Sequence, residues 1–312
     1  MIDERFLSNE ERAIITLRSL YNGYGYAPFK MSKFEEYDLY VKNKDFLVSD
    51  RVITFNDTNG KLLALKPDVT LSIIKNADEG VKTKVYYNEN VYRISGSTGN
   101  FKEIMQTGLE CIGDVDTEDV YEVLYLAAKS LESVSENYVL DVSHMGLLSA
   151  ILDDCSDDEI FKKEITPLIA KKSAHEAKAL CEKYGVSVEK TEDICTLISL
   201  YGDLDDVLPK ISPLCRSDAA KLALSELNKL SNLLKKDFEK GKIRFDVSVV
   251  NNMSYYDGIV FSGFLSGICE AALSGGQYGR LLSSMGKSGD AVGFAIYLDL
   301  LSELDDISGG NV

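Results

Sequence analysis

The sequence has no tryptophan and only two histidines, His144 and His175. Neither histidine has a second His or Cys at the spacing of a metal-binding motif, and the six cysteines include no CxxC pair. A chain of this size in a reducing compartment needs no disulfides, so we interpret the cysteines as mostly buried apolar side chains. These absences predict a protein with no metal site and no cofactor.

Positive charge and long apolar runs are also scarce. Lys and Arg number 34 against 50 Asp and Glu, which leaves a net charge of -16. Nucleic-acid binding depends on neutralising phosphates with basic side chains, so we expect no tRNA partner. No run of about 18 apolar residues could span a bilayer, and the N-terminal MIDERFLSNEER is too charged for a secretory signal. We therefore expect a cytoplasmic protein with no membrane contact.

The first part of the chain reads as a sheet with flanking helices. Ser8 and Glu11 form a capping-box pattern, which predicts a helix to about Asn22. Residues 51–70 predict two strands joined by a turn at Asn59-Gly60, because this pair readily adopts the positive φ of a tight hairpin. Two more strands around residues 84–95 and 104–113 and a helix over 116–134 follow. The pattern favours an antiparallel sheet over a βαβ series.

The segment 145–237 has a different character, with Leu, Ala, Lys and Glu at helical spacing. Ser156 with Glu159 suggests another capping box, and Pro209 and Pro213 mark breaks. Strand patterns return after it, followed by a Gly-rich turn, SGGQYG, a short strand and a last helix. We expect two domains: a core formed by residues 1–144 and 238–312, and an all-helical insertion of residues 145–237.

Several polar residues lie at spacings typical of a ligand site. The block LKPDVT contains Asp68 and is followed by Tyr92-Arg93 and by QTGLE. Taken singly, Asp68 is typical of a turn or cap and Arg93 of a solvated strand residue. Gln106 and Glu110, however, share one strand face with a glycine between them. An amide and a carboxylate arranged in this way suit recognition of an ammonium or imidazole group.

Four blocks occur in the order LKPDVT, VYRISGSTGNFKEIMQTGLECIG, SYYDGIVFSGF and SGGQYGRLLSSMG with AVGFAIYLDLL. This order resembles the catalytic core of histidyl-tRNA synthetase, a class II aminoacyl-tRNA synthetase fold, over roughly residues 10–140 and 244–305. The resemblance implies an α+β protein in which helices flank an antiparallel sheet of six or seven strands. It also implies a dimer that binds its amino acid on that sheet.

The resemblance further implies which residues contact histidine. Without it, the tyrosines would be interpreted as ordinary core residues. The positions that match the family's ligand-binding positions are Asp68, Thr70, Arg93, Gln106, Glu110, Tyr255, Tyr256 and Tyr278.

The positions that match the family's catalytic groups are mostly changed. The histidine-specific arginine is replaced by Asn251, the motif 3 arginine by Leu300, the motif 2 glutamate by Ser95 and the motif 1 proline by Ser32. Ligation needs cations on the ATP phosphates, and removing one such group costs roughly 10²- to 10³-fold in rate. We therefore assign no catalytic residue. The chain stops soon after the motif 3 region, so we also expect no anticodon-binding domain.

A histidine site without ligase chemistry is similar to the regulatory subunits of short-form ATP phosphoribosyltransferase. That resemblance implies a homodimer assembled with a short catalytic subunit, commonly in an octamer, for the first step of histidine biosynthesis and its feedback inhibition by histidine. We expect the N-terminal helix and the sheet-flanking helices to make these contacts. The residues leave open whether histidine acts here or in the partner.

Three other interpretations remain at this point: a stand-alone histidine-binding sensor, a residual synthetase-like ligase, and a fold remnant that acts only as a scaffold.

Overall fold

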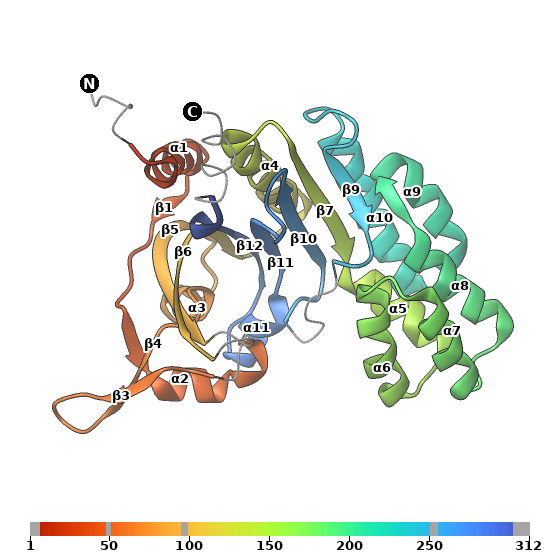
Figure 1. Cartoon of the computed structure of the whole chain (residues 1–312), viewed down its shortest axis with the longest axis horizontal. Coiled ribbons are helices and arrows are strands. Elements are labelled where there is room, and N and C mark those ends of the chain that lie inside the picture. The colour runs from red at the N-terminus through yellow and green to blue at the C-terminus, as the bar shows by residue number, and fades with distance from the viewer. Residues whose placement is uncertain (1–6, 48–50, 95–98, 250–254, 302–312) are drawn as a thin grey trace, which may run out of the picture. The chain divides into compact units, whose positions relative to one another are not determined.

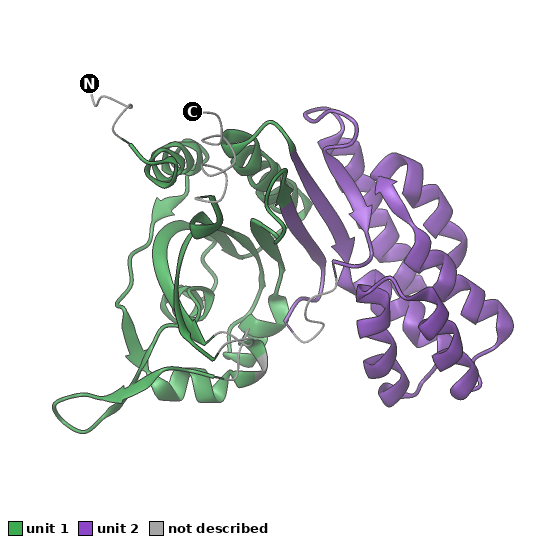
Figure 2. Cartoon of the chain, viewed as in Figure 1, with its two compact units in different colours: residues 1–137, 264–312 green, residues 138–263 purple. Residues whose placement is uncertain are grey.

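The computed structural model describes residues 7–47, 51–94, 99–249 and 255–301. The chain forms two compact units, coloured separately in Figure 2. Unit 1 comprises residues 1–137 and 264–312, and unit 2 comprises residues 138–263. Within the described ranges no helix is both long and apolar enough to cross a bilayer.

Unit 1 is built on strands of which two neighbours are long (Figure 1). Its strands, in spatial order, are β1 (Ala27–Pro28), β5 (Thr83–Ile94), β6 (Phe101–Gly113), β12 (Asp290–Tyr297) and β11 (Leu273–Gln277). The predicted strand pair is confirmed, because β5 and β6 pair along twelve residues in antiparallel register. β6 with β12 and β12 with β11 are also antiparallel, whereas β1 is parallel to β5.

Two capped helices of unit 1 pack together. The predicted capping box of Ser8 with Glu11 is formed at α1 (Asn9–Gly23), and Asp116 with Asp119 forms another at α4 (Thr117–Val134).

Tyr21 joins these two helices to the sheet. Its hydroxyl lies 2.9 Å from Ser130 Oγ, which connects α1 to α4. Its ring contacts those of Tyr86 and Phe294 on two strands, with centroids 6.1 and 6.0 Å away. Tyr21 is fully buried, so these helices cover one face of the sheet with aromatic and apolar side chains.

The predicted hairpin belongs to a separate small sheet of unit 1. Its strands run in the order β2 (Phe34–Glu36), β4 (Leu62–Leu65) and β3 (Thr54–Asn56). The turn between β3 and β4 is longer than a tight hairpin, and only Gly60 has positive φ, at 79°. The Asp57 carboxylate stabilises it by accepting the N–H groups of Asn59 and Lys61, each at 2.8 Å.

Short helices complete unit 1. They are α2 (Tyr37–Lys42), η2 (Lys44–Phe46), α3 (Thr70–Asn76), α11 (Gly279–Ser284) and η4 (Leu298–Leu301). The expected last helix is represented by η4 within the described ranges.

Two local predictions were wrong. SGGQYG is not a turn, because Leu273–Gln277 forms β11, in which Gly275 and Gly276 pair with Phe294 and Gly293. The N-cap of the helix after Ser156 is Asp158, whose carboxylate accepts the N–H groups of Ile160 and Phe161. Ser156 instead accepts the N–H of Asp158 at 3.1 Å.

Unit 2 combines a few strands with a helical layer. Its strands run in the order β10 (Ile259–Leu265), β7 (Tyr138–His144), β9 (Ile243–Asp246) and β8 (Tyr201–Asp203). β7 and β9 are parallel, whereas β8 and β9 are antiparallel. The helices are α5 (Met145–Cys155), α6 (Glu159–Ala170), α7 (Ala174–Lys183), α8 (Val188–Ser199), α9 (Leu204–Ile211), η3 (Ser212–Leu214) and α10 (Asp218–Leu234).

The predicted helical segment 145–237 is therefore confirmed as mostly helical, but β8 interrupts it. β7 and β9, which the sequence assigned to the core, fall in unit 2 with these helices. The division into a core and a separable insertion at residues 145–237 stays a prediction.

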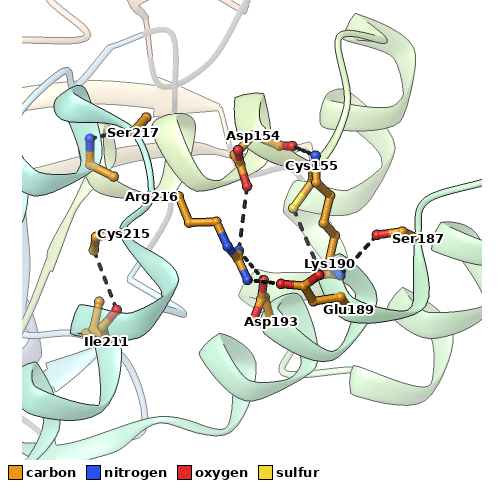
Figure 3. A network of polar contacts seen from close by, with 11 residues as sticks. Asp154, Cys155, Ser187, Glu189, Lys190, Asp193, Ile211, Cys215, Arg216 and Ser217 are labelled. Atoms are coloured by element: carbon orange, nitrogen blue, oxygen red, sulfur yellow. Dashed lines mark hydrogen bonds and ion pairs between the residues drawn. The ribbon is translucent and has the colours of Figure 1, made fainter.

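Arg216 connects three parts of the helical layer (Figure 3). It follows η3, and its guanidinium donates to Asp193 and, at 2.8 Å, to Glu189, both on α8. Asp154 on α5 lies 3.6 Å from the same guanidinium. One cation thus links α5 and α8 to the start of α10.

Candidate ligand-binding site

The predicted alternation on β6 places three site positions on one face of the unit 1 sheet. Gln106 and Glu110 are almost completely buried there, with 4% and 2% of their surface exposed. Gly108 between them lies opposite Tyr87 of β5, and Glu110 lies opposite Gly293 of β12. The two side chains that the sequence singled out therefore share a sheet face, as expected.

Glu110 is the centre of a hydrogen-bonded cluster. The Thr70 hydroxyl, at the start of α3, donates to Glu110 Oε1 at 2.8 Å. The Tyr278 hydroxyl, from the residue that precedes α11, donates to Oε2. The structure thus brings together three predicted site residues that are distant in sequence. No Lys, Arg or His of the described ranges forms an ion pair with this carboxyl.

Burial sets the ionisation of this cluster. Desolvation raises the pKa of Glu110 to about 8, although the hydrogen bonds from Tyr278 and Thr70 lower it, and the charge of Asp68 raises it further. A carboxyl with that pKa is mostly protonated at neutral pH. A bound cation would favour the ionised form, so the site suits an ammonium or imidazolium group.

Two glycines make room for these side chains. A Cβ at Gly293 would lie 1.7 Å from Glu110 Oε2, so any side chain at position 293 would displace that carboxyl. A Cβ at Gly108 would lie 2.6 Å from the Tyr87 hydroxyl and 2.2 Å from the backbone oxygen of Phe294. The sequence drew attention to Gly108, but Gly293 emerges only from the pairing of β6 with β12.

Asp68 and Arg93 position the segment that leads into α3. Asp68 Oδ1 accepts the Leu71 N–H at 2.9 Å, and Arg93 Nε donates to the Pro67 carbonyl at 3.0 Å. Burial raises the pKa of Asp68, whereas the Leu71 N–H and the Arg93 charge lower it. Both residues therefore hold Thr70 in place beside Glu110, and Asp68 adds negative charge to the site.

A buried ion pair beside Gln106 was missed at the level of sequence. Lys66 has no exposed side-chain surface and pairs with Glu89, which is 14% exposed. Glu89 lies opposite Gln106 in the β5–β6 register. Because a single buried Lys in LKPDVT has no distinctive pattern, only the strand pairing could have indicated this contact.

The paired tyrosines lie in the other unit. Tyr255 and Tyr256 belong to unit 2, where their rings form an edge-to-face pair with centroids 4.6 Å apart and an interplanar angle of 67°. Their predicted contact with the ligand stays a prediction.

The changed catalytic positions are only partly described. Ser32 is exposed and Leu300 lies half-buried in η4, whereas Ser95 and Asn251 lie outside the described residues.

Metal-ligating residues do not cluster in the described part of the chain. No group of three His, Cys, Asp or Glu side chains there is arranged to hold a metal ion. His144 accepts the Leu147 N–H at 3.2 Å and lies 2.9 Å from Glu226, so it caps α5 and contacts α10. Four of the six cysteines are buried, as expected, while Cys269 is exposed.

The family model for histidyl-tRNA synthetase matches residues 2–301 of this chain. The chain belongs to the histidyl-tRNA synthetase family. Within that family it is similar to proteins named ATP phosphoribosyltransferase regulatory subunit. The one from Oceanobacillus iheyensis is 27% identical over 96% of this chain and 75% of the relative. The one from Clostridium kluyveri is 29% identical over 91% of this chain and 74% of the relative.

Solved structures agree with this family assignment. An ATP phosphoribosyltransferase regulatory subunit/histidyl-tRNA synthetase from Bacillus halodurans is 25% identical, with a TM-score of 0.84 over 95% of this chain and 79% of that one. The histidyl-tRNA synthetase from Nostoc sp. PCC 7120 is 20% identical, with a TM-score of 0.80 over 96% and 72%. The predicted class II synthetase-like α+β fold is confirmed.

Proposed function

We propose that this chain is the non-catalytic regulatory subunit of ATP phosphoribosyltransferase and works with a separate short catalytic subunit in the first step of histidine biosynthesis. The observation that carries this proposal is the similarity to proteins of that name along more than nine-tenths of the chain. A solved ATP phosphoribosyl transferase (HisG:HisZ) complex from Thermotoga maritima has the same fold, with a TM-score of 0.72 at 20% identity over 94% of this chain and 98% of that one.

The residues of the site support a binding role without ligase chemistry. Glu110, Thr70 and Tyr278 form a buried cluster that can bind a cationic or hydrogen-bonding group. The two arginine positions of the family are occupied by Asn251 and Leu300. Losing two independent electrostatic groups would reduce adenylate formation on the order of 10⁴- to 10⁶-fold. Such a loss leaves recognition without useful catalysis.

Histidine is the ligand that this site fits best. Its ammonium group matches the amide of Gln106 and its imidazole group matches the carboxyl of Glu110, and Asp68 adds negative charge. Feedback requires that histidine bind two states of the assembly with different affinity, because equal affinity shifts no equilibrium. We propose that the two states, which differ in their affinity for histidine, are states of the complex with the catalytic subunit.

The proposed assembly is a cytoplasmic hetero-oligomer built on a homodimer of this chain. We assign its contacts to α1 and to the helices that flank the unit 1 sheet. The strongly acidic chain leaves tRNA outside the proposed set of partners.

The direct test is reconstitution. The purified chain is mixed with the short catalytic subunit of its own organism, and formation of phosphoribosyl-ATP is measured with and without histidine. We expect activity in the mixture to exceed that of the catalytic subunit alone and to fall as histidine is added.

Histidine-dependent pyrophosphate exchange by the chain alone is the control for the ligase alternative. Exchange above background would overturn the non-catalytic assignment. Histidine binding with no effect on any catalytic subunit would favour a stand-alone sensor instead.

A further inference from the structure

Tyr87 lies on the same sheet face as the Glu110 cluster but belongs to no motif of the sequence. It is in the middle of β5, opposite Gly108, and only 3% of its surface is exposed. Its ring crosses the position that a side chain at 108 would occupy, because a Cβ there would be 2.6 Å from the hydroxyl oxygen and 2.7 Å from Cζ. The Tyr87 hydroxyl can therefore occupy this position only because residue 108 is a glycine.

The Tyr87 hydroxyl forms no hydrogen bond with another residue of the described ranges. The side-chain amide of Gln106, on the adjacent strand, is likewise unpartnered in those ranges. Neither group is among the fully enclosed side-chain atoms that lack a partner in the described ranges, so each keeps some accessible surface through which a ligand can reach it. Two such groups on one buried face, next to a carboxyl without a cation, point to a polar ligand.

We propose that Tyr87 is a specificity-determining residue of this site and that its hydroxyl forms a hydrogen bond with the amino acid that Glu110 binds. This inference rests on the proposed function, because it takes histidine as that amino acid. It adds a contact that the family's matching positions do not include.

The chemistry of the hydroxyl fits this role. Burial and the nearby charges of Glu110 and Asp68 raise the pKa of Tyr87 well above its ordinary value, so the group stays protonated. A neutral hydroxyl can donate to a ring nitrogen or a carboxylate of the ligand and can accept from its ammonium group. Arg93, which faces Asp68, holds a positive charge at the edge of this cluster.

A purely structural role is the alternative, because a ring that packs over Gly108 also stabilises the sheet. Tyr87→Phe separates the two roles, since it keeps the ring and removes only the hydroxyl. The matched control is Tyr86→Phe, one residue earlier on the same strand. Tyr86 points to the opposite face, where its ring contacts Tyr21, with centroids 6.1 Å apart.

The experiment measures the Kd of L-histidine for the intact chain by calorimetry, with melting temperatures recorded for each variant. We expect Tyr87→Phe to weaken histidine binding about 5- to 50-fold, the range for one buried hydrogen bond to a polar or charged group. Tyr86→Phe should leave the Kd within about twofold of wild type by the same reasoning.

A second probe locates the contact. 3-(2-Thienyl)-L-alanine keeps the ammonium and carboxylate groups of histidine but lacks the ring nitrogens. If Tyr87 contacts the imidazole, the preference of the wild-type chain for histidine over this analogue shrinks in Tyr87→Phe. If Tyr87 contacts the backbone groups of the ligand, both probes weaken equally, and the proposal also stands.

Unchanged histidine affinity in a folded Tyr87→Phe variant would overturn the role of Tyr87 and leave the regulatory function intact. No histidine binding by the wild-type chain would overturn both the role of Tyr87 and the choice of ligand. The reconstitution assay then decides separately whether the chain still activates its catalytic partner.

Discussion

Glu110 couples the ligand site to pH, because it is a fully buried carboxyl whose partners are hydroxyl groups. Its pKa is about 8 in the folded chain, above its ordinary value of 4.5. A raised pKa means that the stability contributed by the group is fully present below about pH 4.5. That stability is lost as pH rises through about 8.

We predict that Glu110→Gln removes this decrease in stability at high pH. The variant should melt at a higher temperature than wild type at pH 8.5 and show a smaller decrease between pH 6 and 8.5, since each unit of pKa difference corresponds to about 1.4 kcal/mol. The same variant should bind histidine at least about 10-fold more weakly, because a hydrogen bond to a charged group is lost. Thermal unfolding and calorimetry measure the two effects, and parallel pH profiles for variant and wild type would refute the prediction.

Gly293 has no side chain, which leaves room for the Glu110 carboxyl. We expect Gly293→Ala to destabilise the chain by about 1–3 kcal/mol, because the new Cβ would overlap the Glu110 carboxyl. Histidine binding should weaken at the same time. Gly23→Ala is the control, since nothing lies within 4 Å of the added Cβ at the end of α1. Equal melting temperatures for the two variants would show that Glu110 moves aside freely.

The sequence predicted part of this site at residue level. Gln106 and Glu110 could be recognised because alternation on one strand fixes a shared face regardless of what the strand pairs with. Tyr87, Gly293 and the Lys66 ion pair could not, because their proximity depends on the register of β5 and β12 against β6.

Among the structural elements, α8 contacts one cation through two of its carboxylates. Arg216 lies near Glu189 and Asp193 of α8 and Asp154 of α5, and its side chain is 37% exposed. We predict that Arg216→Ala weakens this contact at low salt and has a smaller effect at high salt, because partly exposed ion pairs are screened.

Amide hydrogen exchange of α8 at low and high salt measures this effect locally. Arg216→Lys is the informative control, since it keeps the charge but loses the planar fork that contacts two carboxylates at once. An Arg216→Ala effect that is the same at both salt concentrations would show that packing, rather than charge, holds α8.

Helices with caps were the most predictable elements. Ser8 forms the expected box with Glu11, because a capping box is local to four residues, whereas the box expected at Ser156 was wrong because Asp158 is the N-cap of α6. β8 and β11 were missed for the opposite reason. β8 has only three residues. The glycines of β11 are typical of a turn in the sequence, and only their pairing with β12 shows that they form a strand.

At the scale of the whole molecule, the net charge of -16 governs which partners can approach. We predict no saturable binding of histidine tRNA at about 0.1 M salt, because binding of a polyanion requires basic side chains to displace its counterions. Fluorescence anisotropy with labelled tRNA measures this directly. A Kd of about 1 µM or tighter, beyond the nonspecific range, would reopen a role in tRNA recognition.

The overall fold was predictable from four blocks in a fixed order, but the parallel pairing within unit 2 was not. β7 and β9 are separated by almost a hundred residues, and nothing in either segment specifies its partner. Such non-local pairing depends on how the intervening helices pack, which local patterns do not encode.

The parallel pairing of β7 with β9 limits how this chain could be shortened. A tight turn can join only antiparallel strands, whereas parallel strands need a crossover of a dozen or more residues that returns along the strand. Joining residue 144 directly to residue 238 would leave five residues before β9, too few to cover the length of β7, about 20 Å. A minimal version must therefore keep one helix as the return path, and α10, which leads into β9, is the natural choice.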